Sequence, residues 1–160
     1  MLTNTIMTKP FSLQPLMDLA EHQNDSATRK LGQLNKLQQV AQQKLETLLQ
    51  YRSDYQTRLQ ESSRNGMNPD EIRNFREFIH KIDEAITQQL QAVEQSKAST
   101  QVGRGEFDTT RRKLKSFGML RQRHIETQNK IAEKSEQKAL DEHTGRFTAR
   151  KMLKAEEPNT

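Results

Sequence analysis

The sequence has 160 residues, of which 31% are hydrophobic and 29% are charged, and its net charge is +5. Because a globular domain normally has roughly 45–50% apolar residues, this composition excludes a sizeable globular core. The chain has no cysteine, which excludes disulfides and thiolate metal sites and fits a reducing cytoplasm. No apolar run approaches the roughly 20 residues that span a bilayer, and the first residues lack the pattern of a secretory signal.

The first predicted element is a helix over about residues 11–62, preceded by a flexible tail at residues 1–10. Its evidence is a hydrophobic seam whose positions recur at alternating spacings of four and three residues. This period keeps one stripe of an α-helix against a partner helix, and a disordered chain would have no reason to maintain it. The fourteen seam positions are Leu13, Met17, Ala20, Asn24, Ala27, Leu31, Leu34, Gln38, Ala41, Leu45, Leu48, Arg52, Tyr55 and Leu59.

A turn is expected at residues 63–68, where Gly66 follows Asn65 and can take a positive φ at low cost. A strong helix start follows, because Asn68 suits the N-cap and Pro69 suits the first helical position. The second helix is therefore predicted over about residues 69–151, with a flexible tail at residues 152–160.

The second helix opens with a seam of its own, and two periodic helices joined by a short turn pack as antiparallel neighbours. Its first positions are Ile72, Phe75, Ile79, Ile82, Ile86, Gln89 and Val93. The expected fold is all-α: a long antiparallel two-helix coiled-coil hairpin over residues 11–151. Two irregularities are expected in the second helix, a weak point at Gly103-Arg104-Gly105 and a phase slip of the seam near Ile125.

The charge is concentrated at one end of the sequence. Residues 1–110 contain 13 Lys and Arg against 14 Asp and Glu, whereas residues 111–154 contain 13 against 5. This basic segment is either a solvated helix surface or the footprint of an acidic partner, that is, nucleic acid, a membrane surface or a protein channel. Its candidate contact residues are Arg111, Arg112, Lys113, Lys115, Arg121 and Arg123.

The sequence offers no catalytic or metal-binding constellation. The histidines are scattered and lack the spacing of convergent zinc ligands; they are His22, His80, His124 and His143. There is no phosphate-binding loop, and a two-helix hairpin provides no enclosed site from which water is excluded. We therefore expect no enzyme activity, no cofactor and no small-molecule substrate.

Nucleic acid is an alternative partner for the basic segment. The phosphate-neutralising charge is sufficient for salt-sensitive binding, but the aromatics Phe107, Phe117 and Phe147 are too far apart to form a stacking platform. Interspersed acids such as Glu126 and Glu133 would also oppose a groove. The pattern therefore favours a protein partner over nucleic acid.

A second stripe accompanies the seam of the second helix. Phe78, Ile82, Ala85 and Gln89 follow a spacing of four, three and four, and Phe78 is expected beside the seam, facing away from the first helix. Either Phe78 covers the flank of the seam, or the stripe is an exposed surface that docks on another protein.

The order of several short motifs along the chain resembles the FliJ family of flagellar export proteins. These motifs are Leu16-Met17-Asp18-Leu19-Ala20-Glu21, Leu31-Gly32, Leu48-Leu49-Gln50-Tyr51 with Tyr55, Asn65-Gly66, Phe78-Ile79, Ala85-Ile86 and Glu136-Gln137-Lys138-Ala139-Leu140-Asp141-Glu142. The resemblance extends over about residues 11–150. One departure is that the family often has tryptophan in the second half of the second helix, where this chain has Phe107 and Phe117.

The resemblance implies a soluble component of the flagellar type III export apparatus, similar to the central stalk of rotary ATPases. Family members bind the hexameric export ATPase and promote its assembly and activity. They also bind the cytoplasmic domain of the membrane export gate and the export chaperones. By this resemblance the gate-binding stripe maps onto Phe78, Ile82, Ala85 and Gln89, and the basic end of the second helix is the ATPase contact. The implied location is the cytoplasm, peripherally on the inner membrane at the flagellar base. The equivalent stalk of a virulence injectisome is the remaining alternative.

Overall fold

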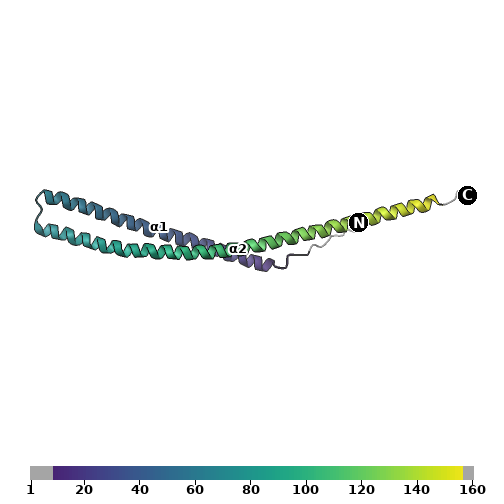
Figure 1. The fold of residues 1–160 in the computed structure, drawn as a ribbon, viewed down its shortest axis with the longest axis horizontal. Helices are drawn as coiled ribbons and strands as arrows, with labels where there is room; N and C mark the ends of the chain where they lie inside the picture. Colours follow the sequence, from purple (N-terminus) through teal and green to yellow (C-terminus); the bar gives the residue numbers. More distant parts are fainter. Residues whose placement is uncertain (1–8, 157–160) are drawn as a thin grey trace. The chain divides into compact units, whose positions relative to one another are not determined.

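The computed structural model describes residues 9–156 and contains two helices, α1 (Gln14–Arg64) and α2 (Pro69–Ala155), shown in Figure 1. No strand occurs within residues 9–156, which confirms the all-α class. Residues 1–8 and 157–160 of the predicted tails lie outside the described residues, whereas the prediction of a flexible tail is wrong for residues 152–155, which are helical. Within the described part, α2 continues through Ala155, beyond the end predicted at residue 151.

The helix ends follow local chemistry. The amide of Gln14 donates to the Phe11 carbonyl at 3.1 Å, so α1 starts three residues later than predicted, after a tight turn. Pro15 falls in the first helical turn, where its missing N–H is not needed.

At the connection between the helices, Gly66 has a φ of 81°, a region in which a Cβ would be strained. The Asn68 side-chain oxygen accepts a hydrogen bond from the Asp70 amide at 3.3 Å. Asn68 therefore caps α2, which starts at Pro69 as predicted.

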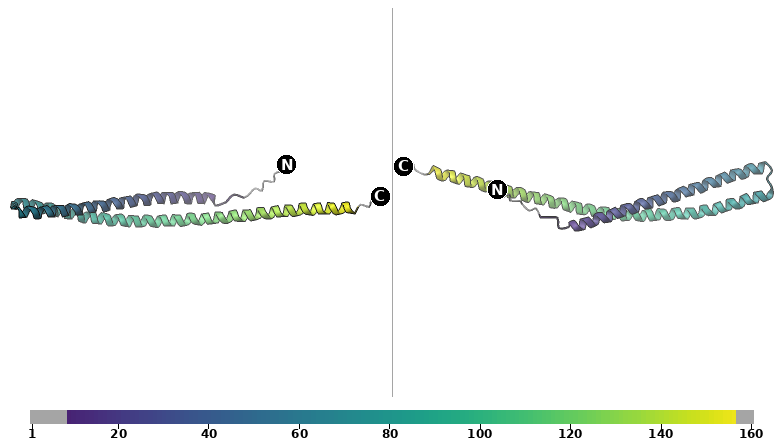
Figure 2. Two further views of the ribbon diagram at one scale, coloured as in Figure 1. Left: turned by 90° about the horizontal axis from the view of Figure 1, so that it is seen from above. Right: turned by 180° about the vertical axis from the view of Figure 1, so that it is seen from behind.

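The structure divides into two compact units. Unit 2 is Ala20–Arg112, and unit 1 combines the described residues up to Leu19 with those from Lys113 onward. In unit 2, α1 and α2 lie side by side and antiparallel, as Figures 1 and 2 show. The predicted helical hairpin is confirmed there.

The core of unit 2 is one stripe from each helix. Leu45 of α1 is buried with Ile82, Ile86 and Val93 of α2, and Ala41, Leu48 and Tyr55 pack partly buried against them. All fourteen predicted seam positions of α1 are buried or half-buried, whereas every other residue from Pro15 to Gln60 is exposed. The 3.5-residue period therefore identified the packing face of α1 completely.

Polar contacts cross the seam at several levels of unit 2. The Gln89 side-chain amide donates to the Ala41 carbonyl at 2.8 Å, and the Thr110 hydroxyl donates to Asn24 Oδ1 at 3.3 Å. The Lys30 ammonium pairs with the Glu106 carboxylate at 2.9 Å. Because each contact requires one alignment of α1 against α2, together they select a single register of the hairpin.

Gly103 is a point of close approach rather than a break. The helix α2 is continuous through Gly103 and Gly105, so the weak point expected there does not interrupt it. Gly103 is buried, and a Cβ at this position would lie 2.5 Å from Cδ1 of Leu34 on α1. A Cβ at Gly105 would meet no atom within 4 Å. Only Gly103 is therefore needed for packing.

In unit 1 the chain segment before α1 packs on α2. His124 Nε2 donates to the Lys9 carbonyl at 2.7 Å, and the Lys9 amide donates to the Gln128 side-chain oxygen at 3.3 Å. The Phe11 and His124 rings lie with centroids 5.7 Å apart.

The phase slip predicted at Ile125 is wrong at that residue, because Ile125 is exposed and His124 and Gln128 hold the inner positions. A slip occurs one turn later, where half-buried Ala132 follows Gln128 after four residues.

We expect Leu45→Asp to destabilise the hairpin by about 3 kcal/mol or more, because it removes a buried side chain and places an unpaired charge in the seam. The control is Leu37→Asp on the same helix, where the native side chain is 62% exposed and the expected change is within about 0.5 kcal/mol. Thermal unfolding followed by circular dichroism makes the comparison. Equal melting of the two variants would place the seam on a different face.

The two glycines of α2 provide a second test. Gly105→Ala should stabilise the protein by about 0.5–1 kcal/mol, because alanine is the better helix former and the new methyl has free space. Gly103→Ala should fall short of that gain by about 1 kcal/mol, because Leu34 must move aside. Urea denaturation measures both free energies of unfolding. An equal gain at the two positions would contradict a packing role for Gly103.

Candidate docking surfaces

The prediction that Phe78 faces away from α1 is wrong. Its ring centroid lies 4.5 Å from that of Tyr55, a seam residue of α1. The ring nevertheless remains 44% exposed. Phe78 therefore covers one flank of the seam, as the first of the two alternatives states, while part of its ring remains exposed to solvent.

The rest of the predicted stripe is only partly accessible. Ile82 is buried in the core of unit 2, and the Gln89 amide is engaged with the Ala41 carbonyl of α1. Ala85 is half-buried. Of the four residues of the predicted stripe, only Phe78 is exposed, whereas Ala85 and Gln89 are half-buried and Ile82 is buried.

Tyr55 organises the aromatic residues at this level of the hairpin. Besides Phe78, its ring lies 6.2 Å from that of Phe75, and the guanidinium of Arg58 lies 5.5 Å from its centroid. Tyr51 precedes Tyr55 by one helical turn and is 54% exposed. We call Tyr51, Tyr55 and Phe78 the aromatic face. The tyrosine pair was visible in the sequence, but no pattern along one helix shows which ring of the other helix it meets.

An ion pair adjoins the aromatic face. The Arg52 guanidinium on α1 donates hydrogen bonds to the Asp83 carboxylate on α2. The hydrogen bond to Asp83 and the charge of its carboxylate raise the pKa of Arg52 above its ordinary value, so Arg52 remains a cation. The contact links the helices next to Tyr55 and Phe78 and so helps to hold the two rings together.

The predicted basic residues are all exposed. Arg111 and Arg112 belong to unit 2, whereas the other four belong to unit 1: Lys113, Lys115, Arg121 and Arg123. Successive residues of an α-helix are about 100° apart around its axis, so the four positions of unit 1 are distributed around the whole circumference of that part of α2. They do not form a basic stripe on one face.

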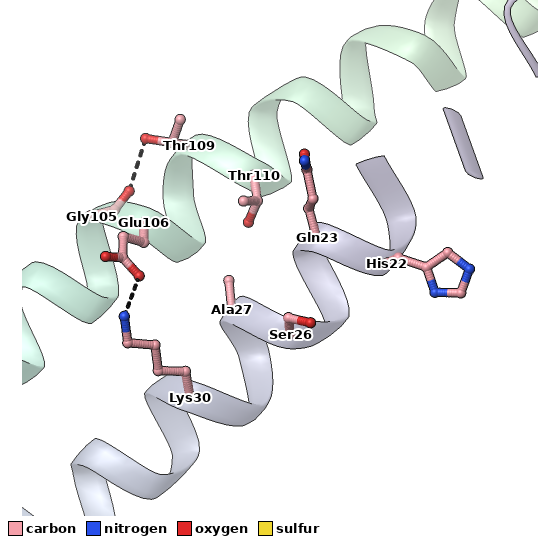
Figure 3. A pocket seen from close by; sticks show the side chains of 9 residues that line it. All are labelled: His22, Gln23, Ser26, Ala27, Lys30, Gly105, Glu106, Thr109 and Thr110. Atoms are coloured by element: carbon pink, nitrogen blue, oxygen red, sulfur yellow. Dashed lines mark hydrogen bonds and ion pairs between the residues drawn. The ribbon is translucent and has the colours of Figure 1, made fainter. Parts of the chain in front are cut away.

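A hollow in unit 2 lies between the two helices and has a volume of about 750 Å³ (Figure 3). Its lining includes the Lys30–Glu106 ion pair, the buried Ala27 and the hydroxyl of Thr110. His22 projects away from the other lining side chains in Figure 3. Residues 9–156 contain no group of three or more side chains that could hold a metal ion.

None of the helices in the described part of the chain is long and apolar enough to cross a membrane. The aromatic face and the basic residues of α2 are both external surfaces of the helices.

Comparison with known proteins identifies the family. The family model described as Flagellar FliJ protein matches residues 8–153. The Flagellar FliJ proteins of Escherichia coli (strain K12) and Salmonella typhi are each 26% identical over 145 residues, which cover 91% of this chain and 99% of theirs. The solved structure of a YscO homolog from Chlamydia trachomatis has the same fold, with a TM-score of 0.61 and 16% identity over 93% of this chain and 99% of that one.

The chain belongs to the FliJ family. It is accordingly a non-enzymatic component of flagellar protein export. The family prediction made from the order of short motifs is confirmed, and the matched range agrees with the residues from which it was made.

Proposed function

We propose that this protein is a stalk-like component of the flagellar type III export apparatus. It binds the hexameric export ATPase, promotes the assembly and activity of that enzyme, and links it to the membrane export gate and to export chaperones. The observation that carries the proposal is a family match over residues 8–153 together with an antiparallel helical hairpin. The protein acts in the cytoplasm, at the inner membrane beneath the flagellum.

The aromatic face is the proposed contact for the export gate. Phe78 and Tyr51 are about half exposed, and Phe78 is held in place by its contact with Tyr55. A partly exposed aromatic side chain on a rigid support has the properties of a binding hot spot, because little conformational freedom is lost on docking. Ala85 extends the surface along α2, while Ile82 and Gln89 support it from the seam.

The basic end of α2 is the proposed contact for the ATPase. Its positive charge complements an acidic partner, and electrostatic complementarity accelerates association. Because the four basic residues of unit 1 are distributed around the helix, they suit a partner that surrounds α2, such as the central channel of a ring, better than a partner that covers one face.

The alternatives have less support. A basic helix that reads a nucleic acid groove would concentrate its cations on one face, whereas these cations are distributed around α2. The YscO homolog shares the fold at 16% identity, whereas the curated relatives at 26% identity are flagellar proteins. The flagellar assignment is therefore the better supported of the two.

Gate binding is tested by separating stability from affinity. Phe78→Ala should cost about 1 kcal/mol of folding free energy, less than the roughly 3–5 kcal/mol for a buried ring, because the ring is 44% exposed. It should weaken binding to the cytoplasmic domain of the gate by about 2 kcal/mol, or thirtyfold. Ile82→Ala should cost about 2–4 kcal/mol of stability and leave the affinity of the folded protein nearly unchanged.

Melting curves and calorimetric titration provide these two quantities for each variant. Val102→Ala is the matched control, because Val102 is a 64% exposed residue of α2 outside the aromatic face and should affect neither quantity. Normal gate affinity of Phe78→Ala, with a stability loss as large as that of Ile82→Ala, would reduce Phe78 to a packing residue.

ATPase contact is tested by charge reversal. Arg121→Glu combined with Arg123→Glu should reduce stimulation of the ATPase on the order of tenfold at low salt and abolish its salt dependence, because both side chains are exposed charges. Lys36→Glu combined with Lys44→Glu on α1 reverses the same number of exposed charges elsewhere and should have little effect. Phosphate release measures the stimulation. If the α2 variant stimulates normally at every salt concentration, these residues are not the contact.

A further inference from the structure

The end of α2, from residue 133 onward, packs against no other described part of the chain. Every residue from 133 to 156 is exposed, in contrast to the half-buried positions that continue as far as Ala132. We call residues 144–155 the terminal segment. It contains three large apolar side chains that are each about two-thirds exposed: Phe147, Met152 and Leu153.

The terminal segment is purely cationic. It carries Arg146, Arg150, Lys151 and Lys154 and no acidic residue. By contrast, residues 133–142 just before it contain Lys134 and Lys138 against four acids. The change from mixed to single-sign charge occurs within the same exposed helix, so solubility alone does not account for it.

The cations surround the exposed ring. At about 100° per residue, Arg150, Lys151, Lys154 and Phe147 fall within an arc of about 100° on one face of α2. These four residues and Leu153 also line one open hollow of about 670 Å³. One aromatic ring is thus presented to solvent within a cluster of three cations.

Another helix is a poor occupant for this face. A coiled-coil partner needs apolar residues at the seam positions, but the stripe that contains Phe147 runs through Glu136, Leu140, His143, Phe147, Arg150 and Lys154, of which only Leu140 and Phe147 are apolar. A second copy of the chain is excluded as a coiled-coil partner for the same reason. Nucleic acid is also a poor fit, because a single ring offers no succession of stacking platforms.

The charge and the apolar content together fit the surface of an anionic bilayer. Lysine and arginine are attracted to the negative potential of such a surface, and an aromatic or aliphatic side chain can enter the boundary between headgroups and acyl chains. We propose that the terminal segment binds anionic phospholipid directly, with Phe147 inserted at the interface and Arg150, Lys151 and Lys154 at the phosphate level. The segment then lies on the membrane and does not span it.

This inference goes beyond the stalk function, because it requires only the chain itself and a lipid surface. If the terminal segment does not bind lipid, the proposed ATPase and gate contacts are unaffected. If those two contacts are not found, the proposed lipid contact is likewise unaffected.

The test is co-sedimentation of the purified full-length chain with vesicles, at low and at physiological salt. Vesicles of phosphatidylcholine with about one-third phosphatidylglycerol should bind the chain at least tenfold more tightly than vesicles of phosphatidylcholine alone. Each cation near an anionic surface contributes about a fivefold factor, so Arg150→Gln combined with Lys151→Gln should weaken binding about 25-fold. Phe147→Ala should weaken it several-fold without changing its salt dependence.

The matched control is Lys134→Gln combined with Lys138→Gln, which removes two exposed charges from the same helix outside the terminal segment. It should bind vesicles nearly as well as the native chain. All four side chains are exposed, so helicity measured by circular dichroism should be unchanged in both variants.

Three results would overturn the proposal: no preference for phosphatidylglycerol, equal losses in the two glutamine variants, or binding that is unaffected by Phe147→Ala. A 20-base-pair DNA duplex is titrated in parallel. If the duplex binds through Arg150 and Lys151 while the anionic vesicles do not bind, the segment is a nucleic acid contact instead.

Discussion

Most of the burial in unit 2 occurs along a single stripe of each helix, and the other properties of the structure follow from that restriction. A two-helix hairpin has no third layer, so each helix can bury only about two residues in seven. The core around Leu45, Ile82 and Ile86 is correspondingly narrow. The remaining positions are free to carry charge and docking residues, which is why a chain with 31% hydrophobic residues can still be folded.

The same restriction explains why the contacts at the edge of the seam matter. Hydrophobic stripes alone permit neighbouring alignments of similar energy, because leucine packs on leucine in more than one register. The amide of Gln89 on the Ala41 carbonyl and the Arg52–Asp83 pair each favour a single alignment. Gly103 acts in the same way through shape, since only there can Leu34 fit closely against α2.

The sequence predicted what depends on one helix at a time. The seam of α1, the cap at Asn68 and the turn at Gly66 all follow from local spacing and backbone preference, and each agrees with the structure. The sequence could not predict which residues meet across the seam. The orientation of Phe78 was wrong because it depends on Tyr55 of the other helix, and the role of Gly103 was missed because it depends on Leu34.

The candidate docking surfaces also differ in how far the sequence alone could predict them. Exposure of the basic residues of α2 could be inferred from their charge, and it is observed. The sequence also placed Ile82 and Gln89 in the seam of α2, and both are engaged there. The exposed fraction of Phe78 could not be predicted, because it depends on the contact of its ring with Tyr55 of α1.

The ladder of polar contacts across unit 2 also limits how the length of the hairpin can change during evolution. Inserting one residue into α1 would rotate all following side chains by about 100° and separate Gln89 from Ala41 or Thr110 from Asn24. An inserted heptad restores the rotation but still moves one helix past the other by about 10 Å. Length changes inside the paired region must therefore come as matched heptads in both helices. The exposed stretch of α2 between Ala132 and the terminal segment makes no such contacts with α1, so a change in its length requires no matching change in α1.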